Sequence, residues 1–280
     1  MEIILADQAG FCFGVRRSLR MAEEALGAGE AVSSVGPLIH NRQVVTDLEA
    51  RGLAVVDGVA DVHPDRVLIV RAHGVGPELL AEAERRGLRT IDATCPFVKR
   101  AQQAAVDLTE QGYQVFVVGE RDHPEVQAIV AHTGGRAQVV DAPDHLAPEG
   151  IESRVGVVAQ TTQSVGEVAR VVEELLRGAQ EIRIANTICQ ATTDRQASAL
   201  RLAEAVDVMI VIGGRHSANT RRLAELCAGT GTPTQHIETA EEIDAVWLRG
   251  VCRVGVTAGA STPQAAVEAT VGRLRDLSPG

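Results

Sequence analysis

The sequence predicts an α/β protein with three similar α/β lobes and mainly parallel sheets, in a pseudo-threefold arrangement around one central site. Short apolar runs rich in β-branched residues alternate with helical patterns along all 280 residues, which is typical of parallel sheets covered on both faces. Three cysteines also divide the chain into nearly equal thirds, and each is followed 28 residues later by a polar loop residue: Cys12 by His40, Cys95 by His123, and Cys189 by Ser217. A repeat of this kind indicates three modules that contribute to one shared centre.

The apolar runs are predicted to be strands. Six of them end in loops with Gly or His, namely Ala31–Val35, Val67–Val70, Gln114–Val118, Arg154–Val158, Asp207–Ile212 and Arg253–Val256. Three more precede the cysteines, namely Ile3–Ala6, Arg89–Ile91 and Ile182–Ile184. Helical patterns between them include Met21–Leu26, Glu78–Arg86 and Ala265–Leu274. We place lobe boundaries near residues 94 and 188, which gives lobes 1–94, 95–188 and 189–280, and we interpret Ala137–Ser153 as a surface connection.

A helix with one apolar face is predicted after each cysteine. The stripes are Val15, Leu19, Ala22 and Leu26; then Val98, Ala101, Ala105 and Leu108; then Ala197, Leu200, Ala203 and Val206. Each cysteine therefore lies at or near a helix start, where amide dipoles stabilise a thiolate and lower its pKa.

Composition excludes several classes of function. The net charge is −10 and only 2% of residues are aromatic, so the basic stripes and stacking rings of a nucleic-acid-binding protein are missing. The longest apolar run, Val206 to Ile212, is interrupted by Asp207 and is far too short to cross a membrane. Met1 leads directly into a strand-like segment without a cationic leader, so we expect a cytoplasmic protein. An anionic ligand must then be held by local dipoles and histidines.

The cysteines do not form a disulfide scaffold, because five of them in a chain of this length are more typical of ligands, catalytic groups or core residues. Three thiolates are one ligand short of a closed zinc site, and the C-x₂₋₄-C pair of such sites is missing. A 4Fe–4S cluster held by three cysteines leaves one iron without a protein ligand. The alternative is that each thiol is a small buried hydrophobe; we assign Cys227 and Cys252, which lack the repeated spacing, to the core.

The loops of the first and second thirds offer hydrogen-bond donors for a phosphate group, and one candidate proton donor. His40 and His73 follow buried strands beside glycines and can donate hydrogen bonds to a phosphate. Glu125 follows His123 and Pro124, and a carboxyl group in a dry pocket has a raised pKa and can deliver a proton. It can equally be the first-turn acid of a helix that begins at the proline. Thr161 and its neighbours offer hydroxyls for a substrate, or else a helix N-cap.

The last third carries two turns rich in small residues and hydroxyls, around Ser217 and Asn219 and around Ser261. Backbone amides and polar side chains at such helix starts form a cradle for a phosphate or diphosphate. Neither turn matches a P-loop, and a clear G-x-G-x-x-G is missing, so nucleotide binding is disfavoured.

These segments together closely resemble the 4-hydroxy-3-methylbut-2-enyl diphosphate reductase family of the non-mevalonate isoprenoid pathway. The resemblance runs in order through essentially the whole chain and is carried by Phe11-Cys12-Phe13-Gly14-Val15, His40-Asn41, Ala72-His73-Gly74-Val75, Asp92-Ala93-Thr94-Cys95-Pro96, Gly119, His123-Pro124-Glu125, Gln160-Thr161-Thr162, Ile188-Cys189, Ala191-Thr192 and Thr257-Ala258-Gly259-Ala260-Ser261.

The resemblance implies an iron–sulfur oxidoreductase. One 4Fe–4S cluster per chain would be held by Cys12, Cys95 and Cys189, with one iron left open to the substrate. Two electrons and protons would convert (E)-4-hydroxy-3-methylbut-2-enyl diphosphate into isopentenyl and dimethylallyl diphosphates. A ferredoxin or flavodoxin would be the electron donor, with neither nucleic acid nor membrane as a partner.

The resemblance also implies roles for the loop residues. Glu125 would be the catalytic proton source, assisted by His123 and Thr161. The substrate-binding positions would be His40, His73, His123, Thr161, Thr162, Ser217, Ala218, Asn219 and Ser261. Ala218 departs from the family pattern, which has a second serine there. Two alternatives stay open: a redox-neutral Fe–S hydro-lyase, and a non-catalytic metal- or phosphate-binding protein.

Overall fold

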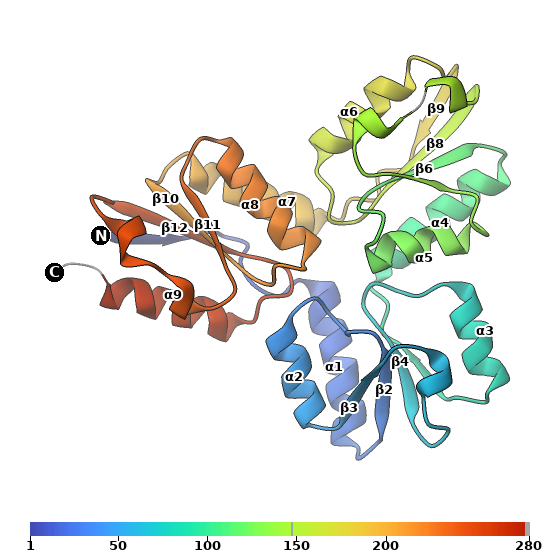
Figure 1. The fold of residues 1–280 in the computed structure, drawn as a ribbon, viewed down its shortest axis with the longest axis horizontal. Coiled ribbons are helices and arrows are strands. Elements are labelled where there is room, and N and C mark those ends of the chain that lie inside the picture. Colours follow the sequence, from blue (N-terminus) through green and yellow to red (C-terminus); the bar gives the residue numbers. More distant parts are fainter. Residues whose placement is uncertain (147, 278–280) are drawn as a thin grey trace. The chain divides into compact units, whose positions relative to one another are not determined.

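The computed structural model describes residues 1–146 and 148–277 and has the predicted α/β fold (Figure 1). Within those residues the strands form three fully parallel sheets of four strands. The first sheet contains, in order, β3 (Leu53–Val56), β2 (Val32–Val35), β4 (Val67–Val70) and β5 (Thr90–Asp92). The second contains β7 (Gln138–Val140), β6 (Gln114–Val118), β8 (Arg154–Ala159) and β9 (Glu181–Ile184). The third contains β11 (Thr234–Ile237), β10 (Val208–Ile212), β12 (Arg253–Ala258) and β1 (Glu2–Leu5).

Each sheet repeats one strand order, in which the strand before a cysteine is an edge strand. In the third sheet this edge strand is β1, which comes from the N-terminus and pairs with β12, so that Glu2 lies opposite Arg253. Residues 2–5 thus belong to the sheet of the last third of the chain, while the proposed lobe boundaries near residues 94 and 188 stay a prediction.

The opposite edge strand of each sheet was not predicted from the sequence. These strands are β3, β7 and β11, and the interpretation of Ala137–Ser153 as a surface connection was wrong at its start, where β7 lies. The physical reason is that these strands are short and mostly half-buried or exposed. Only one residue of each strand is buried. β7 and β11 also contain polar residues, whereas β3 is a short apolar run that was overlooked.

Helices connect the strands and cover the sheets. The α-helices are α1 (Phe13–Gly27), α2 (Arg42–Ala50), α3 (Pro77–Arg85), α4 (Pro96–Glu110), α5 (Pro124–His132), α6 (Val165–Leu175), α7 (Gln190–Ala203), α8 (Ala218–Gly229) and α9 (Gln264–Asp276). Short 3₁₀ helices are η1 (Val59–Asp61), η2 (Pro143–His145), η3 (Pro148–Gly150), η4 (Ala240–Glu242) and η5 (Ala245–Leu248). The described helices include none that is both long and apolar enough to span a membrane.

The chain forms two compact units. Unit 1 comprises Met1–Phe13, His40–Val44 and Gln190–Gly280 and holds the third sheet. Unit 2 comprises Gly14–Ile39 and Val45–Cys189 and holds the first and second sheets.

In unit 1 the third sheet is buried on both faces. Ile210 of β10 belongs to the same core cluster as Leu274 of α9, whereas its neighbour Met209 belongs to the cluster of Leu202 and Leu223 from α7 and α8. This alternation explains why β10 is apolar at every position, because successive side chains of a strand point to opposite faces.

In unit 2 the second sheet is covered in the same way. Val117 of β6 packs in a cluster with α4 and α5, and Phe116 packs with Leu175 of α6. The first sheet contributes Leu68 of β4 to a smaller cluster with Ala83 of α3.

The apolar stripes predicted after the cysteines were confirmed in part. All four residues of the α4 stripe are buried, and Leu19 and Ala22 of the α1 stripe are buried. Of the third stripe, Ala203 and Val206 are buried, whereas Ala197 and Leu200 are only half-buried. The buried face of α7 also includes Arg195, Ala199 and Leu202, which were not predicted. An arginine can occupy this face because backbone carbonyls accept its hydrogen bonds.

Candidate active site

Each of the three repeated cysteines is tied to a polar loop by its backbone amide. The Cys12 amide donates to the Ala260 carbonyl oxygen (3.0 Å), the Cys95 amide to that of Ala72 (2.9 Å), and the Cys189 amide to that of Thr161 (3.1 Å). The acceptors are Thr161 itself and the residues just before Ser261 and His73. The threefold repeat predicted from spacing therefore has a matching threefold hydrogen bond.

The same cysteines lie at helix starts and form no disulfide within the described residues. All three are half-buried, Cys95 is the N-cap of α4, and α1 and α7 begin directly after Cys12 and Cys189. Amide dipoles at a helix N-terminus stabilise a thiolate, which is the form that binds metal.

The two remaining cysteines lie elsewhere. Cys227 is buried in the α7–α8 core, and burial raises the pKa of its thiol to about 11, so it is a poor ligand. Cys252 was wrongly assigned to the core: it is exposed just before β12, where its amide donates to Asp207.

Glu125 is the buried acid of unit 2. Its side chain accepts two hydrogen bonds from one residue, because the Thr161 amide donates to Oε1 (2.6 Å) and the Thr161 hydroxyl donates to Oε2 (3.0 Å). Only 2% of the residue is exposed, and this burial raises the pKa of the carboxyl to about 7 although both hydrogen bonds lower it. The carboxyl group can therefore carry a proton near neutral pH.

The start of α5 positions this acid. His123 is the N-cap, its Nδ1 accepts a hydrogen bond from the Glu125 amide (3.1 Å), and Pro124 occupies the first turn. Glu125 is thus a first-turn acid, as the alternative interpretation held. Its carboxylate also accepts hydrogen bonds from Thr161, on the loop after β8, so the residue is both a first-turn acid and a buried carboxyl group, while its role as a proton source stays a prediction.

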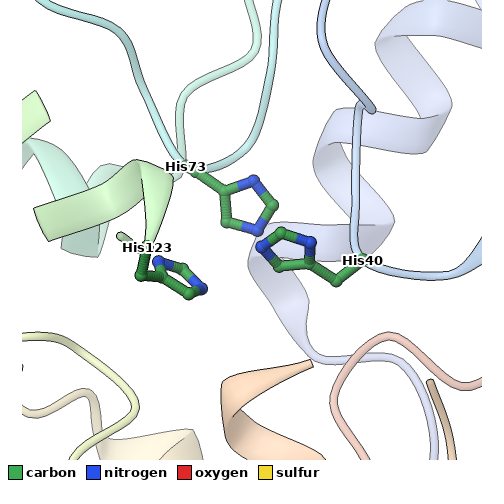
Figure 2. Close-up of side chains that lie close together, drawn as sticks. All are labelled: His40, His73 and His123. Carbon is green, nitrogen blue, oxygen red and sulfur yellow. The ribbon is translucent and has the colours of Figure 1, made fainter. Parts of the chain in front are cut away.

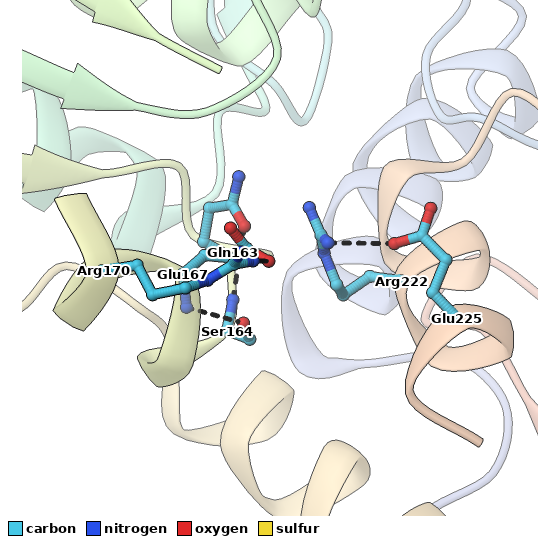
Figure 3. A network of polar contacts seen from close by, with 6 residues as sticks. All are labelled: Gln163, Ser164, Glu167, Arg170, Arg222 and Glu225. Atoms are coloured by element: carbon cyan, nitrogen blue, oxygen red, sulfur yellow. Dashed lines mark hydrogen bonds and ion pairs between the residues drawn. The ribbon is translucent and has the colours of Figure 1, made fainter. Parts of the chain in front are cut away.

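Thr161 is available to Glu125 because another residue caps the next helix. Ser164 is the N-cap of α6, and its hydroxyl accepts a hydrogen bond from the Glu167 amide (3.2 Å; Figure 3). Glu167 in turn pairs with Arg170. The alternative reading of this loop as a helix cap therefore applies to Ser164 and not to Thr161, and Thr162 lies half-buried beside it.

Two histidines of unit 2 lie against each other. The rings of His73, after β4, and His123 are perpendicular, with centroids 5.4 Å apart (Figure 2). Contacts in unit 2 thus run without a break from the loop of Cys95 and His73, through His123, Glu125 and Thr161, to Cys189.

Unit 1 joins the loops that carry His40 and Ser261. The Ser261 hydroxyl donates to the His40 carbonyl oxygen (3.0 Å), and the Asn41 side chain donates to the Ser261 carbonyl oxygen (2.9 Å). A Cβ atom on Gly214 would lie 3.0 Å from the same His40 carbonyl oxygen, so the loop before Ser217 passes close by. His40 of the first third and Ser261 of the last third therefore lie side by side in unit 1.

The start of α8 holds the other predicted residues of unit 1. Ser217 is the N-cap and accepts a hydrogen bond from the Thr220 amide (3.4 Å), so its own hydroxyl hydrogen can point to a ligand. Ala218 is the buried first residue of the helix. Asn219 is 4% exposed, and neither its Oδ1 nor its Nδ2 has a hydrogen-bond partner among residues 1–146 and 148–277. On the same helix, Arg222 pairs with Glu225 (2.9 Å; Figure 3).

Arg195 was missed from the sequence. It is 4% exposed on α7 and donates to three backbone carbonyls on the loops around Cys12 and Ser261. Its spacing could have identified it, because Arg195 lies four residues before Ala199 and seven before Leu202, and residues with this spacing share one face of a helix.

Comparisons with known proteins extend over nearly the whole chain. Residues 3–275 match the family described as LytB protein. A protein of Geobacter metallireducens named 4-hydroxy-3-methylbut-2-enyl diphosphate reductase is 51% identical over 99% of this chain and 98% of its own length. A protein of Pelobacter propionicus with the same name is 49% identical over 99% of both chains.

Solved structures are similar as well. One, described as (E)-4-hydroxy-3-methyl-but-2-enyl diphosphate reductase, the terminal enzyme of the non-mevalonate pathway, is 42% identical with a TM-score of 0.72 and covers 99% of this chain and 100% of its own. Another, the E-1-hydroxy-2-methyl-but-2-enyl-4-diphosphate reductase of Plasmodium falciparum, is 27% identical with a TM-score of 0.91, over 97% of this chain and 87% of its own.

Proposed function

Because the chain belongs to the LytB protein family, we propose that it is an oxidoreductase of isoprenoid biosynthesis that removes the allylic hydroxyl group of (E)-4-hydroxy-3-methylbut-2-enyl diphosphate. The substrate takes up two electrons and two protons, the C–O bond breaks, and water and either isopentenyl or dimethylallyl diphosphate leave. The observation that carries the proposal is Glu125, a buried carboxyl group with a pKa of about 7. Thr161 donates a hydrogen bond to this carboxyl group, and the carbonyl oxygen of Thr161 accepts one from the Cys189 amide.

We propose Cys12, Cys95 and Cys189 as the ligands of a 4Fe–4S cluster. The donor set fits, because these are three half-buried thiols in one repeated setting, while Cys227 is buried in a core and Cys252 lies outside the repeat. When bound, such a cluster supplies electrons, and an iron without a protein thiolate supplies Lewis acidity for cleavage of a C–O bond. The chain's own residues then bind and orient the substrate and deliver the proton.

Glu125 is the proposed proton donor. A carboxyl group with a pKa near the working pH is protonated often enough to act and gives up its proton readily. The Thr161 hydroxyl, which contacts Oε2, would orient this proton, and His123 would assist by holding the first turn of α5.

The proposed substrate-binding residues come from several loops. They are His40, His73, His123, Thr161, Thr162, Ser217, Asn219 and Ser261, with the helix-start amide of Ala218. Among them, His40, His73, Ser217, Asn219 and Ser261 would hold the diphosphate. Asn219 supports this part most directly, because leaving a buried polar group without a partner costs about 1–3 kcal/mol. A diphosphate oxygen would accept a hydrogen bond from its Nδ2.

Ala218 removes one hydroxyl from this set. A hydrogen bond to a charged group contributes roughly 1.5–3 kcal/mol, so we expect weaker diphosphate binding and unchanged chemistry. We further propose a low-potential ferredoxin or flavodoxin as electron donor, and the cytoplasm as location, since its reducing conditions keep free thiols reduced.

The test is a single turnover of anaerobically purified, photoreduced protein with the allylic diphosphate, analysed by mass spectrometry. We expect isopentenyl and dimethylallyl diphosphates in amounts that match the electrons consumed. Conversion of substrate without oxidation of the cluster would indicate a redox-neutral hydro-lyase instead. Colourless protein without iron would indicate a non-catalytic binding protein.

A further inference from the structure

Arg195 of α7 makes an unusual set of contacts in unit 1. Its Nη1 donates to the carbonyl oxygens of Gln8 and Ala258 (2.7 Å each), and its Nη2 donates to that of Gly10 (2.8 Å). The side chain is 4% exposed, so these bonds form away from water. A buried arginine is rare unless acceptors surround it, and here the carbonyl oxygens of two separate loops accept three hydrogen bonds from its Nη1 and Nη2.

The first of these loops leads to Cys12. Gln8 and Gly10 precede the cysteine by four and two residues, and the start of the loop is also tied to α7, because the Asp7 amide donates to the Ser198 hydroxyl (3.0 Å). Gly10 has φ +91°, a conformation that favours glycine, and its Cβ position faces the Thr262 carbonyl oxygen at 3.6 Å. The loop is therefore held between α7 and the turn after β12.

The second loop is that turn, and it carries Ser261. Ala258, which accepts from Arg195, is the last residue of β12, and Ala260 accepts from the Cys12 amide. A Cβ atom on Gly259 would lie 2.0 Å from the Thr220 hydroxyl, so the turn also packs against the first turn of α8, next to Asn219. One guanidinium thus joins the loop of a proposed cluster ligand to the turn of a proposed diphosphate ligand.

We infer that Arg195 is a positioning residue, which fixes the distance between the Cys12 thiol and the diphosphate-binding groups around Ser261. The inference rests on the proposed function, in which Cys12 holds the cluster and the groups around Ser261 bind the diphosphate. The planar guanidinium is suited to the task, since it presents several donors in a fixed geometry. A lysine keeps the charge but offers one nitrogen, which cannot reach three carbonyl oxygens in the same way.

The experiment compares R195K and R195Q with R201Q. Arg201 lies on the same helix and pairs with Asp7 of the same loop (3.8 Å), but both side chains are exposed, which makes it a matched control. We expect R195K to fold and to show faster hydrogen exchange of the amides of residues 6–12 and 258–262 only. We also expect its affinity for inorganic diphosphate to fall at least tenfold, while R201Q stays within about twofold of wild type.

In steady state, the reductase reaction of R195K should show a raised KM for the allylic diphosphate and a smaller change of kcat per iron. A merely structural role would instead reduce the folded fraction without moving KM. Wild-type exchange and wild-type diphosphate affinity in R195K would overturn the inference, and so would equal effects in R201Q. If R195Q does not fold, the R195K results still test the inference.

A wild-type protein without reductase activity would contradict the proposed function, whereas the exchange and diphosphate measurements would still test the role of Arg195.

Discussion

At the scale of single residues, Glu125 shows how one position can serve both the fold and the chemistry. As the first-turn acid of α5 it follows a rule of helix starts, and that rule alone places an acid there without any function. Its burial has a different cause, because Thr161 of another loop contacts both carboxylate oxygens. The raised pKa follows from this burial, and the proposed proton transfer depends on it.

Glu125→Gln should therefore abolish most turnover and leave the brown colour of the cluster. The amide keeps the size of the side chain and can still accept from the Thr161 amide, but it carries no acidic proton. General acid catalysis contributes about 10²–10⁴-fold, so we expect kcat per iron to fall by at least about 10². Asp122→Asn is the matched control, since this neighbouring acid is exposed, and it should stay within about twofold of wild type. A normal rate in E125Q would remove Glu125 from the proton role.

The raised pKa of Glu125 also predicts how stability depends on pH. Between the ordinary value of 4.5 and about 7, the folded protein keeps a proton on this carboxyl that the unfolded chain has lost. The contribution of Glu125 to the free energy of unfolding should thus be greatest below pH 4.5 and fall as pH rises to about 7, by at most about 1.4 kcal/mol per pH unit.

Urea unfolding of wild type and E125Q across pH 4.5 to 8 measures this contribution as the difference between the two. The free energy of unfolding of wild type should fall steadily relative to that of E125Q as the pH rises to about 7, and the difference should then level off. A difference that is constant over the whole range would show that burial does not raise this pKa.

At the scale of elements, the turn after β12 is held by close packing as well as by hydrogen bonds. Gly259 faces Thr220 of α8 so closely that an added Cβ atom would lie 2.0 Å from the hydroxyl oxygen and 3.1 Å from the threonine Cβ atom. Asn219 comes directly before Thr220, and Ser261 comes two residues after Gly259. The contact between Gly259 and Thr220 therefore sets how closely these two proposed diphosphate-binding segments approach each other.

Gly259→Ala should destabilise the protein by about 1–3 kcal/mol, the usual cost of overpacking a well-packed site, and should weaken diphosphate binding. Thr220→Ala in the same chain removes the clashing hydroxyl and should restore part of both. Gly272→Ala is the control, because this glycine lies inside α9 with no atom within 4 Å of the Cβ position. It should stabilise by about 0.5–1 kcal/mol. Thermal unfolding and diphosphate titration measure both effects, and a neutral G259A would contradict the packing argument.

Elements also show where sequence reasoning succeeds and where it stops. The central strands, such as β10, were predictable because both faces are buried and every residue is apolar. The edge strands β7 and β11 were not, because they are short and contain polar residues, and β3 was missed although Leu53–Val56 is an apolar run. Arg195 was missed for a related reason: a charged residue on a helix is normally exposed, and only the carbonyls of distant loops allow it to be buried.

At the scale of the whole molecule, the three thirds share a framework but not a chemistry. The common features are the strand order and the hydrogen bond from each cysteine amide to a strand-end loop. The fixed spacing predicted three similar modules, but it did not predict these two features. The side chains beside that bond differ, with a histidine at 73, a threonine at 161 and a serine at 261. Spacing could not reveal that β1 joins the sheet of the last third, because that pairing links the two ends of the chain.

The shared framework predicts that the three cysteines are equivalent in holding iron. Cys12→Ser, Cys95→Ser and Cys189→Ser should each lose most of the iron and the visible absorption, since a serine hydroxyl is a much weaker ligand than a thiolate. Cys252→Ser is the control, because this thiol is exposed, lies in the same unit as Cys12 and has no place in the repeat. It should keep wild-type iron and sulfide. Anaerobic iron and sulfide analysis with far-ultraviolet circular dichroism separates loss of the cluster from loss of the fold. An intact cluster in any one of the three variants would remove that cysteine from the ligand set, and with it the equivalence that the threefold framework implies.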